Sequence, residues 1–263
     1  ISINETLDAM VIFAQQGRDQ AEVVSLVETS LLAANVANMK AKDATEFLTA
    51  AVLQFNKEAK DSIDFLDKWV NVASKNAVTA RVLAEATKGV GVAARLSGID
   101  IDYFNGMVTS IAAATRKTGK EVGTGLRFIF RQFRRDKALK ALQDSGIAVF
   151  ATGNKFDRSA GMKGMGTSYR ALQKIIEDIA AKWKDLNEIQ RENISTSLGG
   201  RRHYNVIKVL FENYDQALKA TTDSQNSWGS ALTKNQIIMN TFNKTLAGIK
   251  VSFQELVASI GTS

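Results

Sequence analysis

The chain has 263 residues, a formal net charge of +7 and neither proline nor cysteine. Proline at its average frequency would occur about 13 times in this length, and because proline interrupts helix interiors its absence favours an all-α fold. The lack of cysteine and the single histidine, His203, exclude disulfide frameworks, thiolate metal sites and sites built on several histidines. We therefore predict no cofactor and no metal.

The length allows one large domain or two small ones. No run of 18 apolar residues occurs, so the sequence predicts no membrane span. The first residue is Ile1 rather than methionine, and we expect a processed product or a piece of a longer protein.

Helical periodicity begins near the start of the chain. Val23, Val27 and Leu31 follow the i, i+4, i+8 spacing of one helix face, and residues 38–42 are predicted to form a turn. We expect further helices on either side of it.

Acidic pairs three residues apart indicate the next two helix starts. The pairs are Asp43 with Glu46 and Asp61 with Asp64, a spacing similar to that of a capping box.

Three more helix starts follow from residues that commonly cap helices. They are Thr79, either Asp100 or Asp102, and Thr118. The first of these helices is expected to end at Gly98 and the last near Arg134. Turns then recur about every 20 residues, a spacing that predicts stacked helical hairpins, about ten helices in all.

A glycine-rich stretch near residues 144–168 has no helical pattern and is predicted to be a loop. It divides the chain into an N-terminal helical-hairpin region (1–145), a connector (146–168) and a C-terminal helical region (169–263). Within the connector, Gly161–Ser168 resembles a P-loop, but Thr167 stands where that motif needs lysine, so we interpret it as a loop.

Helical spacing resumes after the connector. Apolar residues from Leu172 to Leu186 step by four and three, and Asn187 with Gln190 predicts another capped start. Gly199 and Gly200 are expected to end that helix, and a further helix is predicted over 204–213.

The last segment has a strict heptad pattern. Thr233 with Gln236 fits a capping box, and a long helix is predicted to follow it. Its apolar positions are Met239, Phe242, Leu246, Ile249, Phe253, Leu256 and Ile260. The helix either packs on its own domain or forms a coiled-coil seam with another chain or another part of a longer protein.

Residues 126–140 contain six basic side chains and one acidic one. If this stretch is one helix, its four arginines share a face that would suit a phosphate, a membrane surface or an acidic partner. These candidate contact residues are Arg127, Arg131, Arg134 and Arg135. The alternative is a solvated face paired with neighbouring carboxylates.

Glycines at positions 119, 123 and 125 do not match a dinucleotide-binding fingerprint. Their surroundings are helical, so we predict that they allow two helices to approach closely.

One part of the sequence resembles the core region of phage tail tape-measure proteins. Residues 96–111 and 118–127 carry the resemblance, and its most specific element is the run Val122, Gly123, Thr124, Gly125, Leu126 and Arg127. The family usually has alanine or another small residue where this chain has Gly125. The similarity covers roughly residues 5–215 in family order.

The resemblance implies a structural protein of the virion that lies in the tail lumen. Such proteins set tail length, leave the tube before DNA passes, and assemble in the host cytoplasm with tail-tube, tail-tip and tail-chaperone proteins. It also implies a packing role for Gly123–Arg127 and no catalytic residues. We expect a homo-oligomer.

Two other functions stay open from the sequence. A basic helical module binding nucleic acid or protein would use the four arginines of residues 126–140, and DNA contact would then depend on salt. A helical muramidase would need convergent carboxylates, whereas the acidic residues here stand mostly at helix starts.

Overall fold

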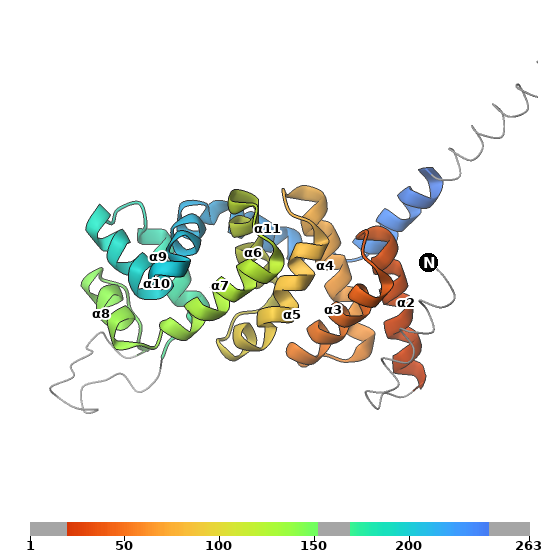
Figure 1. The fold of residues 1–263 in the computed structure, drawn as a ribbon, viewed down its shortest axis with the longest axis horizontal. Helices are drawn as coiled ribbons and strands as arrows, with labels where there is room; N and C mark the ends of the chain where they lie inside the picture. The colour runs from red at the N-terminus through yellow and green to blue at the C-terminus, as the bar shows by residue number, and fades with distance from the viewer. Residues whose placement is uncertain (1–19, 152–168, 242–263) are drawn as a thin grey trace, which may run out of the picture.

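A computed structural model describes residues 20–151 and 169–241, which confirm the all-α prediction (Figure 1). The helices are α2 (Gln20–Val36), α3 (Ala41–Gln54), the 3-10 helix η1 (Ala59–Asp61), α4 (Ser62–Lys75), α5 (Ala80–Leu96), α6 (Ile101–Thr115), α7 (Gly119–Gln132), α8 (Asp136–Asp144), α9 (Leu172–Lys182), α10 (Glu188–Glu212) and α11 (Tyr214–Gln225). A further helical segment spans 230–241. Among the described residues, the β-structure is one isolated bridge between Phe150 and Tyr169.

The helices stack in two rows to form an elongated body. In one row α5 packs between α3 and α7, and α7 in turn packs against α10. In the other row α4 contacts α2 and α6, while α11 covers α4 and α6. Figure 1 shows α2 at one end of the body and α8 with α9 at the other. This is the predicted arrangement of stacked helical hairpins.

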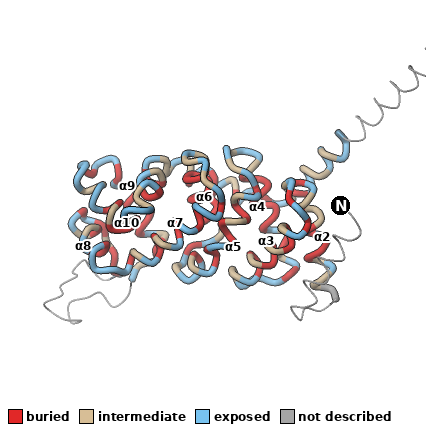
Figure 2. Tube along the Cα trace, viewed as in Figure 1, coloured by how far each residue is buried: buried red, intermediate tan, exposed pale blue. Residues whose placement is uncertain are grey.

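The apolar core is continuous between the rows. It extends from Leu26 to Ala231, and its largest fully buried side chains include Trp69, Tyr103 and Phe104. Figure 2 shows buried residues where facing helices meet. The core contains residues from both sides of the connector, and the division into 1–145, 146–168 and 169–263 stays a prediction.

Local capping rules located several helix starts correctly. Thr79, Asp100, Thr118 and Asn187 each accept a hydrogen bond from the backbone N–H three residues later. At Thr118 and Asn187 the capping box is complete, because the side chain three residues later accepts the cap's own N–H. Gly98 adopts φ +73° after α5, a conformation that favours glycine.

The predicted helix cap at Asp43 is wrong by three residues, because the N-cap of α3 is Lys40. Helix α3 begins at Ala41 and has no side-chain cap. Asp43 instead pairs with Arg81 (2.9 Å), and Glu46 pairs with Lys88 (2.5 Å), both from α5. Asp43 and Glu46 therefore form ion pairs with another helix instead of capping α3.

The next acidic pair is partly as predicted. Helix α4 begins directly after Asp61, but the Asp61 carboxylate accepts the N–H of Glu58 (2.9 Å) rather than capping α4. Together Glu58 and Asp61 form a capping box on η1.

The basic stretch is not one helix. Helix α7 ends at Gln132, and Arg135 is the extended N-cap of α8, with ψ 143°. The break places Asp136 in the first turn of α8, where a carboxylate interacts favourably with the helix dipole. The prediction that four arginines share a helix face is therefore wrong, and α7 carries only Arg127 and Arg131 of the four.

The connector and the end of the chain are described in part. Residues 145–151 form the expected turn, with Gly146 at φ +70°. The P-loop-like segment at 161–168 and the heptad positions from Phe242 onward lie outside the described residues. Gly200, at φ +57°, interrupts α10 where a helix end was predicted.

The last described helical segment begins earlier than predicted. It begins at residue 230, so Thr233 is not its cap, and the Thr233 hydroxyl donates to the Gly229 carbonyl instead (3.0 Å). Figure 1 shows this segment leaving the body at the end where α2 lies. In the part of the chain that the structure describes, no helix is long and apolar enough to cross a membrane.

Candidate functional site

The glycines of α7 allow the close helix contacts that the sequence predicted. A Cβ added at Gly123 would lie 3.2 Å from a Val90 methyl and 3.3 Å from the Ala86 carbonyl oxygen, both on α5. A Cβ at Gly125 would lie 3.3 Å from both His203 and Val206 on α10. Helix α7 therefore lies close to both α5 and α10, and glycine at these two positions allows the close approach.

The other residues of this motif have different surroundings. Leu126 is fully buried, whereas Thr124 and Arg127 are exposed. The Thr124 hydroxyl donates to the Lys120 carbonyl (2.8 Å). On one side of α7 the motif packs against neighbouring helices through Gly123, Gly125 and Leu126. Thr124 and Arg127 lie on an exposed edge of the same helix.

The exposed edge of α7 is basic. Lys120, Arg127 and Arg131 stand at i, i+7 and i+11, so they follow one face of the helix, and all three are exposed. None of the three forms an ion pair with another described residue.

Helix α10 adds two arginines beside this edge. Arg201 and Arg202 are exposed and likewise have no ion pair within the described ranges. The next residue, His203, packs its ring on Phe128 of α7, with centroids 5.1 Å apart. We call the exposed set the basic surface: Lys120, Arg127, Arg131, Arg201 and Arg202.

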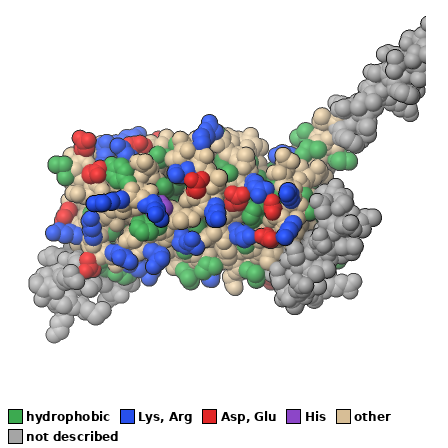
Figure 3. Space-filling model, in the orientation of Figure 1, with side chains coloured by type: hydrophobic (Ala, Val, Ile, Leu, Met, Phe, Trp, Pro, Cys, Tyr) green, Lys and Arg blue, Asp and Glu red, His purple; other side chains and the backbone are tan. Residues whose placement is uncertain are grey.

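The electrostatics of His203 reflect this setting. Burial lowers the pKa of His203, and the nearby cations Arg202 and Lys117 lower it further. In Figure 3 Lys and Arg side chains surround the single histidine, whereas toward α2 basic and acidic side chains are intermixed.

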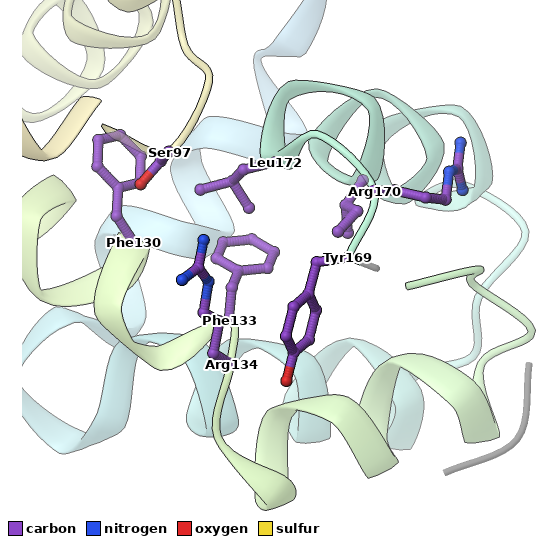
Figure 4. A pocket seen from close by; sticks show the side chains of 8 residues that line it. Ser97, Phe130, Phe133, Arg134, Tyr169, Arg170 and Leu172 are labelled. Atoms are coloured by element: carbon purple, nitrogen blue, oxygen red, sulfur yellow. The ribbon is translucent and has the colours of Figure 1, made fainter. Parts of the chain in front are cut away.

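The other two predicted arginines lie in the turn between α7 and α8. The Arg134 guanidinium lies 5.4 Å from the centroid of the Tyr169 ring, within the range of a cation–π contact. Figure 4 shows both side chains at a small pocket that Phe130, Phe133 and Leu172 also line. Its volume of about 40 Å³ leaves room for water only. Arg134 is thus engaged with Tyr169, whereas Arg135 is exposed at the start of α8.

A buried polar cluster holds the last helical segment, and the sequence reasoning missed it. Asp67 on α4 is 3% exposed, and its carboxylate accepts the N–H groups of Gly229 and Ala231 (both 2.8 Å). Asn71, one turn later, donates to the Asp223 and Asn226 carbonyls (2.6 and 3.1 Å). In the sequence, Asp67 stands between the apolar pairs Phe65–Leu66 and Trp69–Val70, which indicates that it needs a polar partner but not where that partner lies.

A second buried polar cluster joins α4, α6 and α11. The Asp102 carboxylate accepts from Lys68 (2.7 Å) and from Ser224 (2.5 Å), and Ser224 accepts from Asn105 (3.0 Å). These bonds connect helices far apart in the chain, so this cluster secures the fold. Among the described residues, no group of three or more acidic or histidine side chains is placed to hold a metal ion.

These features define an elongated helical scaffold with one basic face. The family model for phage-related minor tail proteins matches residues 1–200 of the chain. The chain therefore belongs to the phage-related minor tail protein family, which assigns it a structural role in a phage tail. No solved structure matches it.

Proposed function

We propose that this chain is a segment of a phage tail tape-measure protein. In this role it lies in the tail lumen, helps to set tail length, and leaves before DNA ejection. Its partners are tail-tube, tail-tip and tail-chaperone proteins, and further copies of itself. It works by packing and assembly rather than by catalysis.

The stacked helices are the observation that carries this proposal. Neighbouring helices of a row pack on one another and the body is long in the direction of the rows, with α11 folded back onto α4 and α6. A protein that measures length needs a dimension that increases with chain length, and a two-row stack has this property.

The start of the last helical segment supports the same function. Asp67 and Asn71 fix the turn before residue 230, and Asn35 of α2 donates to Asn235 (2.6 Å). The segment therefore leaves the body in a set direction (Figure 1).

Deletion and duplication of one hairpin in the full-length phage protein test the proposal. Removing residues 80–115 takes out α5 and α6, and electron microscopy of the tails measures the result. A hairpin kept in the stack would change tail length by about 10 Å, the distance between packed helices. A hairpin drawn out into continuous helix would change it by roughly 50 Å at about 1.5 Å per residue.

Both outcomes require deletion to shorten the tail and duplication to lengthen it by the same amount. Duplication is the control for misfolding, since it leaves every native contact possible. Tails of unchanged length in both variants would contradict the proposal.

A further inference from the structure

We propose that the basic surface binds the phosphate backbone of duplex DNA. This inference does not depend on the measuring role, because it rests on the charge and shape of one face of the body. It also replaces the predicted set of four arginines by residues from two helices.

The basic surface carries unbalanced positive charge. The five cations are exposed and have no acidic partner among the described residues. Asp43, Glu46 and Glu85 line a pocket with Lys120 and Arg127, but these three acids already pair with Arg81 and Lys88. Glu121 and Glu192 also lie beside the basic surface, and its five cations outnumber them. The surface therefore keeps a positive field that attracts a polyanion.

The basic surface is long enough to face several phosphates of a duplex. Lys120 and Arg131 are eleven residues apart on α7, which places them about 16 Å apart along the helix. Helix α10 packs beside α7 through His203 and Phe128, so Arg201 and Arg202 extend the charge sideways. Duplex DNA carries about one negative charge per 1.7 Å of its axis, and a surface of this length faces several phosphates.

The surroundings of the basic surface suit DNA better than a protein partner. Protein interfaces have an apolar centre, and none of the large exposed apolar side chains of the described residues lies on α7 or within ten residues of Arg201. Such side chains lie elsewhere, as at Leu53, Leu96 and Trp228.

The same surface does not suit single-stranded nucleic acid. Proteins that bind single strands stack the bases on exposed aromatic rings. Two aromatic rings beside the basic surface are partly buried and already in contact with other side chains. Phe128 packs on His203, and Tyr204, which lines a hollow with Arg201 and Arg202, donates its hydroxyl to Glu192. Four of the five cations are arginines, whose planar guanidinium matches phosphate geometry. A regular duplex backbone is the partner that these features fit.

The test measures binding of the whole chain to a fluorescent 30-base-pair duplex at several salt concentrations. If all five cations contact phosphates, the slope of log K against log salt is about −4.5. Raising salt from 50 to 200 mM would then weaken binding about 500-fold. The double variant Arg127→Gln, Arg131→Gln should reduce the slope by about 1.8.

The matched control removes the same charge from paired positions. Arg81→Gln with Lys88→Gln should leave the slope unchanged, and circular dichroism checks that both variants fold. The proposal is overturned if both double variants change the slope equally, because net charge alone would then explain binding. It is also overturned if the wild-type chain binds polyglutamate or a single strand but not the duplex, or binds none of these at low salt.

Discussion

Two charged regions of the same helical row are built in opposite ways. Where α3 and α5 meet, two basic side chains have acidic partners: Arg81 pairs with Asp43 and Glu85, and Lys88 pairs with Glu46. On α7 and α10 the five cations of the basic surface have none within the described residues. The first region uses charge to join helices, whereas the second leaves it available to a partner.

This difference shows which charges belong to the fold. A partnered charge loses an interaction when it is removed, so its removal lowers stability. An unpartnered cation beside other cations contributes repulsion, so its removal leaves stability unchanged or raises it. The predictions below follow this distinction from the largest effect to the smallest.

The largest effect is expected at the buried charge. Asp67→Ala leaves the N–H groups of Gly229 and Ala231 without an acceptor and should lower the free energy of unfolding by about 3 kcal/mol. Urea denaturation measures it. Asp64→Ala, an exposed acid on the same helix, is the control and should change stability by less than about 0.5 kcal/mol. Equal effects would show that the carboxylate does not hold the last segment.

The second prediction concerns the contact between the two regions, where α7 packs against α5. Gly123→Leu forces a side chain against Val90 and Ala86 and should destabilise by about 2 kcal/mol. Gly89→Leu, where nothing lies within 4 Å of an added Cβ, should instead stabilise by about 0.5 kcal/mol through helix propensity. Thermal unfolding compares the two. If Gly123→Leu does not lower the stability, α5 and α7 do not approach each other closely at this position.

A smaller loss is expected in the paired region. Arg81→Ala removes two ion pairs, one to Asp43 and one to Glu85, and should cost about 0.5 to 1 kcal/mol at low salt. High salt should reduce this cost, because exposed pairs are screened. A cost that does not change with salt would mean that the Arg81 stem, rather than its charge, stabilises the contact.

The smallest effect is a pH dependence at the basic surface. The pKa of His203 is lower in the folded chain than in the unfolded chain, where it has its ordinary value of about 6.5. As the pH falls, the unfolded state therefore binds the proton before the folded state does. Stability should therefore fall as the pH decreases from about 7.5 to 5.5. His203→Gln should lose less stability over this range in parallel urea titrations. Identical pH profiles of the wild-type chain and His203→Gln would show that folding does not lower the pKa of His203.

Most of the fold could be predicted from the sequence because helix signals are local. Thr79, Asp100 and Thr118 cap helices through bonds to residues three positions away, and apolar spacing marks the buried faces. Asp43 misled the same rule because its partner, Arg81, comes from another helix.

The candidate site could be predicted only in part, for the same reason. Arg127 and Arg131 stand out in the local charge pattern, but Arg134 contacts Tyr169 from beyond the connector. Arg201 and Arg202 join the site only because α10 packs against α7. The partners of Asp67 lie more than 160 residues away, and no local pattern specifies such a pairing.

The most direct test of the distinction between the two regions is the sign of one stability change. Arg127 and Arg131 are four residues apart, and like charges at this spacing repel. Urea denaturation of Arg127→Ala, Arg131→Ala at low salt should show unchanged stability or a gain of about 0.3 kcal/mol, which disappears at high salt. A loss as large as that of Arg81→Ala would mean that these arginines serve the fold, and the account of a free basic surface would be wrong.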